Sequence, residues 1–207
     1  MSKKSQHPPL GDIPETTAFE IVASGFGAIP VIGPTIQTVL NKTIPNIRAE
    51  RVETYLRYLQ DQIDELKLKL ALERPEGLDL FEEGLWQSAR AVSEKRKKYI
   101  QSLVADGLNN NREHSESQYY LRLLTQLGDD DIIRLWDELT WFRDHPNATD
   151  EEKAKRWTGF SETENARRLY LASFGLLKAH ATYGGGNVAG EPTEVCKKFL
   201  ELVGLWV

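Results

Sequence analysis

Few side chains in this sequence have the type and spacing that catalysis requires. His114 stands between Glu113 and Glu116, and a histidine with two carboxylates could hold a divalent metal ion or exchange protons. His180 could act as a general base, and Cys196 could act as a nucleophile. Simpler interpretations are a solvated loop or helix start around His114, a half-buried structural histidine at position 180, and a buried apolar thiol at position 196. We favour the simpler interpretations and predict no catalytic residue and no metal site.

Sequence motifs for cofactor binding are incomplete. Gly25 and Gly27 begin a pattern typical of dinucleotide-binding loops, but the third glycine is missing and no predicted strand precedes them. The run from Asp129 to Asp131 lacks the further spacing of a calcium loop, and acidic residues in that place are typical of a helix start. The sequence therefore predicts no cofactor and favours a non-enzymatic protein.

The composition indicates a folded protein that does not depend on disulfides. The chain has 207 residues, of which 40% are hydrophobic and 28% are charged, and its formal net charge is −5. The single cysteine excludes an intrachain disulfide. The mildly acidic balance argues against a protein dedicated to nucleic-acid binding, although a local basic patch is compatible with it.

The N-terminal part divides into a polar arm and an apolar segment. Residues 1–17 carry three prolines and predict a flexible arm. Residues 18–40 hold a single charge, and Pro30 and Pro34 interrupt them, which predicts a tight apolar helical hairpin over residues 18–43. This hairpin either forms the buried centre of a helical bundle or inserts into a membrane after release. We expect a cytoplasmic protein, with peripheral attachment to the inner membrane surface as a further expectation.

Two long helices are expected next. Apolar residues at three- and four-residue spacing predict one helix from Asn46 to about Glu73 and another from about Leu78 to Leu108. The four-residue link between them would fold them back as a long antiparallel hairpin. Together with the apolar hairpin they would form a helical bundle over residues 18–112.

The second of these helices carries the strongest cluster of basic residues in the chain. Such side chains could bind anionic lipid headgroups or nucleic-acid phosphates, and a plain solvated helix face is the alternative. The candidate residues for binding an anionic surface are Arg90, Lys95, Lys97 and Lys98, while Arg96 lies nearer the apolar stripe.

The second half predicts shorter helices and one strand. Helices are expected over residues 119–127, from Asp129 onward, after the capping residue Ser161 and over residues 193–203, with a polar loop over 145–159, a strand over 176–183 and a glycine-rich turn over 184–190. This order is typical of a winged helix-turn-helix. The predicted fold is therefore mainly α, with an N-terminal helical bundle followed by a small winged-helix-like α+β domain over residues 113–207.

A winged helix would place two arginines against DNA. Arg167 and Arg168 lie on the helix that would contact the duplex. However, Glu162 and Glu164 lie beside them, and acidic residues outnumber basic ones from Asp129 to the end of the chain. Because a surface that binds phosphates usually has the opposite balance, DNA binding through these arginines is the alternative rather than the favoured prediction.

Several segments of the second half resemble a family of small bacterial helical proteins, the abortive-infection alpha type. The similar segments are YYLRLLTQL with IIRLWDEL, RRLYLASFGLLKAH and TEVCKKFLELVGL, in which Thr193 and Phe199 occupy the expected threonine and aromatic places. Glu194, Val195 and Cys196 depart from the family pattern. The resemblance implies a helical N-terminal part, a winged-helix-like C-terminal part and a role in phage defence, without a mechanism.

These observations lead to one functional expectation and one alternative. We expect a non-enzymatic bacterial protein that acts through protein–protein or membrane contacts in phage defence. A winged-helix transcriptional regulator is the alternative. A protein partner is expected first, an inner-membrane surface second and nucleic acid third, and the sequence leaves the oligomeric state open.

Overall fold

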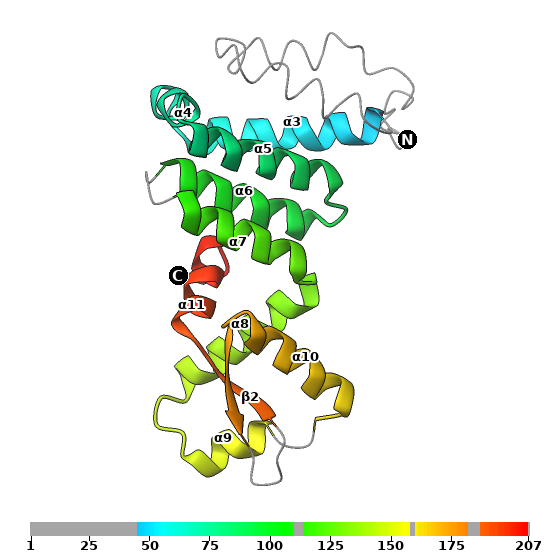
Figure 1. Cartoon of the computed structure of the whole chain (residues 1–207), viewed down its shortest axis with the longest axis vertical. Helices are drawn as coiled ribbons and strands as arrows, with labels where there is room; N and C mark the ends of the chain where they lie inside the picture. The colour runs from blue at the N-terminus through cyan, green and yellow to red at the C-terminus, as the bar shows by residue number, and fades with distance from the viewer. Residues whose placement is uncertain (1–44, 110–113, 158–159, 182–186, 207) are drawn as a thin grey trace, which may run out of the picture. The chain divides into compact units, whose positions relative to one another are not determined.

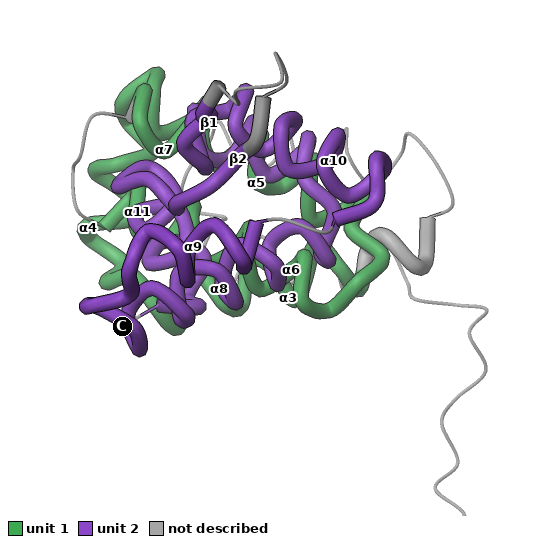
Figure 2. Tube along the Cα trace, turned by 90° about the horizontal axis from the view of Figure 1, so that it is seen from below, with its two compact units in different colours: residues 1–118 green, residues 119–207 purple. Residues whose placement is uncertain are grey.

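The computed structural model describes residues 45–109, 114–157, 160–181 and 187–206 (Figure 1). The predicted mainly α fold with a small α+β part is confirmed by these residues, which form helices and one two-stranded antiparallel sheet. Contacts divide the chain into unit 1, up to Gln118, and unit 2, from Tyr119 onward (Figure 2). The predicted arm over residues 1–17 and the apolar hairpin over residues 18–43 lie outside the described residues.

Unit 1 is built around helix α5. This helix contacts α3, α4 and α6. Tyr55 on α3 and Phe81 on α5 are among the largest fully buried side chains of the unit. Burial of these rings and of several leucines against one another supplies the main stabilisation of the unit. The helices are α3 (Pro45–Gln62), α4 (Glu65–Leu72), α5 (Pro75–Arg90), α6 (Glu94–Asn109) and the beginning of α7 (His114–Gln126).

The prediction of two long helices is wrong, because each one divides into two. The first breaks after Gln62, where the Asp64 carboxylate accepts hydrogen bonds from the backbone N–H groups of Leu66 and Lys67 and starts α4. The second breaks at residues 91–93, where the Ser93 hydroxyl accepts a hydrogen bond from the Arg96 N–H. A side chain that bonds nearby backbone N–H groups ends one helix and caps the next, and the apolar spacing does not reveal it.

Gly84 allows three helices to approach closely in unit 1. A Cβ atom at this position would lie 2.5 Å from Cγ2 of Val104 and 2.6 Å from the hydroxyl of Tyr55. That hydroxyl donates a buried hydrogen bond of 3.0 Å to the carbonyl of Phe81. The lack of a side chain at position 84 therefore preserves both the packing and this hydrogen bond.

We expect Gly84→Ala to destabilise the protein although alanine favours helices. The overpacking costs about 1–3 kcal/mol and outweighs a gain in helix propensity of up to about 1 kcal/mol. Urea-induced unfolding followed by circular dichroism measures the difference, with Asp79→Ala on the exposed side of the same helix as the control. Equal stability of the two variants would contradict the packing argument.

Unit 2 contains helices around a small sheet. The predicted strand and the helix starts at Asp129, Ser161 and Thr193 are confirmed, and the last two side chains accept hydrogen bonds from backbone N–H groups of the helices that they cap. Gly175 follows α10 with a φ of +71°, which favours glycine. The elements are the rest of α7, α8 (Asp129–Asp144), α9 (Asp150–Trp157), α10 (Glu162–Ser173), β1 (Leu177–Ala181), β2 (Asn187–Pro192) and α11 (Glu194–Leu202).

Two predictions for unit 2 are wrong. The polar loop expected over residues 145–159 contains helix α9, and the glycine-rich turn expected over residues 184–190 runs into strand β2. Thr149 and Glu152 explain the helix, because the Thr149 N–H donates to the Glu152 carboxylate and the Glu152 N–H donates to the Thr149 hydroxyl. Strand β2 begins inside the predicted turn because Ala189 pairs with Ala179 across the two antiparallel strands.

Candidate functional site

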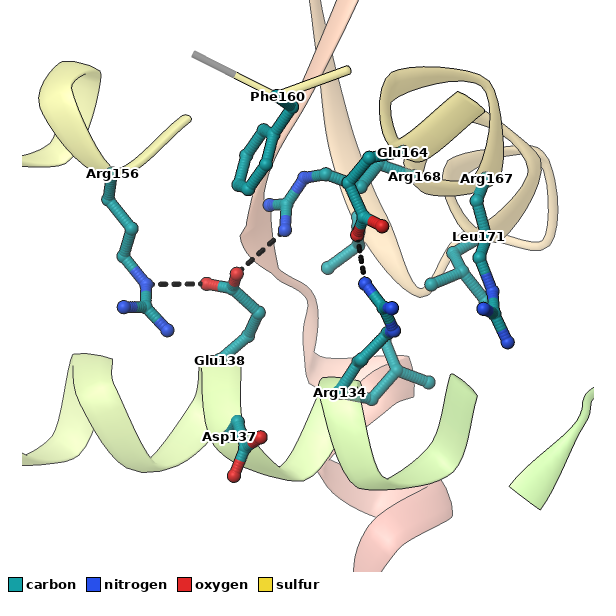
Figure 3. A pocket seen from close by; sticks show the side chains of 11 residues that line it. Arg134, Asp137, Glu138, Arg156, Phe160, Glu164, Arg167, Arg168 and Leu171 are labelled. Carbon is teal, nitrogen blue, oxygen red and sulfur yellow. Dashed lines mark hydrogen bonds and ion pairs between the residues drawn. The ribbon is translucent and has the colours of Figure 1, made fainter. Parts of the chain in front are cut away.

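An arginine-lined pocket lies between helices α8, α9 and α10 of unit 2 (Figure 3). Its volume is about 150 Å³. Charged side chains dominate the lining, and apolar side chains complete it. The lining residues are Arg134, Arg156, Arg167 and Arg168, the carboxylates Asp137, Glu138 and Glu164, and the apolar residues Leu135, Phe160, Leu171 and Leu177.

The Glu138 carboxylate is shared by two guanidinium groups. It accepts a hydrogen bond of 2.9 Å from Nε of Arg156 on α9 and one of 2.7 Å from Nη1 of Arg168 on α10. Arg168 also donates to the carbonyls of Ala189 and Gly190 on β2, at 3.1 and 3.4 Å. Since Glu138 and Arg168 are only 7% and 5% exposed, this buried pair ties α8, α10 and the sheet together.

Two further arginines are held by their own carboxylates. Arg134 forms an ion pair with Glu164, and Arg167 forms one with Asp131. The hydrogen bond to Asp131 raises the pKa of Arg167 above its ordinary value. These ion pairs fix the position of each guanidinium group beside the pocket.

Three of the arginines retain donors that the described part of the chain does not use. A guanidinium group has five N–H donors. Arg134, Arg156 and Arg167 each use one nitrogen in a hydrogen bond to a carboxylate, and no other side-chain hydrogen bond of theirs is formed among the described residues. Chemically, the pocket can therefore donate several charge-assisted hydrogen bonds to an anionic group.

The two arginines predicted to contact DNA are engaged inside unit 2. Arg168 is buried and bonded to Glu138 and to β2, so its guanidinium group is not presented to solvent. Arg167 is partly exposed and paired with Asp131. Both residues line the pocket, and sequence patterns gave no indication of their carboxylate partners.

The basic residues predicted to bind an anionic surface lie at the junction of α5 and α6. Arg90 is exposed, with its guanidinium carbon 5.5 Å from the centre of the Trp86 ring, and Lys95 and Lys98 are exposed. Lys97 is different, because its side chain is only 14% exposed and its Nζ lies 2.6 Å from a Glu94 carboxylate oxygen. Three of the four predicted residues are therefore presented to solvent.

His180 and Cys196, which were considered for catalysis, are not part of the pocket lining. The prediction of a half-buried His180 is wrong, because its side chain is exposed and its ring stacks on Trp157 with 5.9 Å between the ring centres. Cys196 is buried as predicted, and burial raises the pKa of its thiol to about 12. The side chain of His114 lies outside the described residues. Within the described ranges no group of histidine, cysteine and acidic residues is arranged to hold a metal ion.

We expect the Cys196 thiol to be unreactive in the folded protein. The thiolate is the reactive form, and both burial and the raised pKa suppress it near neutral pH. The rate of reaction with a thiol-specific disulfide reagent at pH 8 should be at least about tenfold lower for the folded protein than for the protein in denaturant. Equal rates would show that the thiol is accessible.

Sequence reasoning missed Glu138 and Arg156, although α8 contains a signal for the first. The buried face of this helix includes Asp131, Leu135 and Glu138, so carboxylates stand at helical spacing on an otherwise apolar stripe. A charged residue in a buried position requires a partner of opposite charge. The identity of that partner depends on tertiary structure, because Arg168 lies 30 residues away along the chain.

Comparisons with protein-family models, curated proteins and solved structures gave no match to this chain. The described residues contain no helix that combines the length and apolar character required to span a membrane.

Proposed function

We propose that this protein acts by binding rather than by catalysis, and that unit 2 takes an acidic group of a protein partner into the arginine-lined pocket. The observation that carries the proposal is the set of N–H donors of Arg134, Arg156 and Arg167 that the described residues leave unused. These arginines come from three helices and line one pocket. Arginine clusters of this kind are a recurring means of recognising acidic groups in proteins.

The charges around the pocket favour a localised acidic group over a long polyanion. Acidic residues outnumber basic residues in unit 2, so an extended nucleic acid would meet repulsion outside the pocket. The two arginines that a DNA-binding protein would use are paired with Asp131 and Glu138. A single acidic side chain would contact only the pocket and would not meet the repulsion outside it.

Labelled peptides that differ in one central residue would test this function. We expect fluorescence anisotropy to show binding of peptides with a central glutamate or phosphoserine and none of the peptide with glutamine. Arg156→Gln should weaken binding, whereas Arg122→Gln on the exposed surface of α7 should not. Equal binding of acidic and glutamine peptides would refute the proposal. Tighter binding of a DNA duplex, with a steep salt dependence, would favour the transcriptional regulator instead.

A membrane surface is a second candidate partner, through unit 1. Arg90, Lys95 and Lys98 are exposed, and Val92 between them is 82% exposed, a combination that suits an anionic interface. Each basic residue contributes about 1 kcal/mol near such a surface. Flotation with vesicles containing phosphatidylserine should therefore be reduced by Lys95→Glu with Lys98→Glu, and unchanged flotation of this variant would exclude the surface.

A cytoplasmic location and a role in phage defence belong to the same proposal. The role in phage defence is supported by the resemblance to the abortive-infection alpha type. Survival of bacteria that express the protein, with and without phage challenge, tests the role directly. The variant Arg156→Gln would show whether the pocket takes part in it.

A further inference from the structure

We infer that the preferred ligand of the arginine-lined pocket is the phosphoryl group of a phosphate monoester. This inference rests on the proposed function and names the chemical class of the acidic group. It depends on the number of available donors, the helices that carry them, and the size and edge of the pocket.

The available arginine N–H donors come from three different helices. Arg134 lies on α8, Arg156 on α9 and Arg167 on α10, and each lines the pocket (Figure 3). One nitrogen of each arginine is held by a carboxylate. A carboxylate can satisfy its two oxygens with one guanidinium group in a planar, bidentate pair. A phosphoryl group has three terminal oxygens that do not share a plane, so it can accept hydrogen bonds from donors on more than one helix.

The carboxylates already present hold the arginines in place, and around Glu138 they leave an excess of positive charge. Glu138 is shared by Arg156 and Arg168, so two positive charges meet one negative charge there. Figure 3 shows the Asp137 carboxylate turned away from the other charged side chains, although it contributes to the lining. Because the guanidinium groups are held in place before a ligand arrives, less conformational entropy is lost when it binds.

The pocket also accommodates the organic part of such a ligand. Its volume of about 150 Å³ is about ten times what one water molecule needs. Phe160 is 36% exposed at its edge, with its ring centre 4.8 Å from the guanidinium carbon of Arg168. Leu171 and Leu177 add apolar lining. An ester with an aromatic alcohol can therefore place its ring against Phe160 while the phosphoryl group meets the arginines.

Calorimetry with phenyl phosphate and benzoate tests the inference on the full-length protein. Both ligands present one ring and one acidic group, so the comparison isolates the geometry and charge of that group. We expect phenyl phosphate to bind at least about tenfold more tightly than benzoate. Its affinity should fall below about pH 6, where the phosphate monoester loses one negative charge.

Arginine variants locate the binding. Arg134→Gln and Arg156→Gln should each weaken phenyl phosphate binding by about tenfold, whereas Arg122→Gln should leave it unchanged. Near-ultraviolet circular dichroism checks that the variants are folded. We expect Arg156→Gln to fold, because Glu138 stays paired with Arg168.

Several results would overturn the inference. These are no binding of phenyl phosphate, equal affinity for benzoate, or an equal loss of affinity in Arg122→Gln. Inorganic phosphate binding as tightly as phenyl phosphate would remove the role of Phe160 and with it the monoester. Each of these outcomes is distinct from a failure of the proposed function, which the glutamate and glutamine peptides decide separately.

Discussion

Replacing Glu138 by glutamine should lower the free energy of unfolding of unit 2 by about 3–5 kcal/mol. Glutamine keeps the shape of the side chain and removes its charge. Arg168 would remain 95% buried without a counter-ion, and Arg156 would lose its charged partner as well. The large effect arises mainly from this uncompensated buried charge rather than from the loss of two hydrogen bonds.

The neighbouring carboxylate provides a matched control for this experiment. Asp137 precedes Glu138 on α8 but is exposed, and Asp137→Asn should change stability by less than about 0.5 kcal/mol. Urea-induced unfolding followed by tryptophan fluorescence reports mainly on unit 2, because only Trp86 of the five tryptophans lies in unit 1. If both variants unfold at the same urea concentration, the pair between Glu138 and Arg168 does not hold the unit together.

The helix starts at Ser161 and Thr193 could be predicted from the sequence, because the groups that cap each helix lie within a few residues of one another. Ser161 and Thr193 each accept a hydrogen bond from a backbone N–H three residues later, so a short stretch of sequence contains the whole signal. The same rule applies to Asp64 and Ser93, but there the apolar spacing continues through the break and conceals the cap. Apolar periodicity identifies a buried face, but two consecutive helices can form that face as well as one long helix can.

Helix α9 shows a different limit of apolar patterning. It has no fully buried residue, so its sequence contains no apolar stripe. Its stability comes from a capping box at Thr149 and Glu152 and from contacts of Arg156 and Trp157 with α8. The prediction of a polar loop overlooked the capping box, which is a local pattern, whereas the contacts with α8 depend on the fold.

The pocket could not be predicted for the same reason that Arg167 and Arg168 were considered as alternative contacts for DNA. A basic residue on a helix looks the same in sequence whether it faces solvent or a carboxylate. Arg134 and Glu164 are 30 residues apart, and Arg167 and Asp131 are 36 residues apart. Only tertiary packing brings these charges together, so a single sequence cannot show which charges are paired.

Replacing Phe199 by alanine should destabilise unit 2 about as much as replacing Glu138 by glutamine. Its ring is completely buried on α11 and stacks on Tyr120 with 6.1 Å between the ring centres. Phe199→Ala removes this burial and leaves a cavity, which costs about 3–5 kcal/mol. Urea-induced unfolding followed by tryptophan fluorescence measures the loss, and Lys197→Ala on the exposed side of the same helix is the control.

A second substitution at this position separates cavity formation from a specific role of the aromatic ring. Phe199→Leu keeps most of the volume, so it should cost less than about 1.5 kcal/mol if packing alone matters. A loss as large as that of Phe199→Ala would mean that stacking on Tyr120 dominates. Because α11 contacts α8, loss of this packing should also loosen the helix that carries Arg134 and Glu138. We therefore expect Phe199→Ala to weaken phenyl phosphate binding, although Phe199 does not line the pocket.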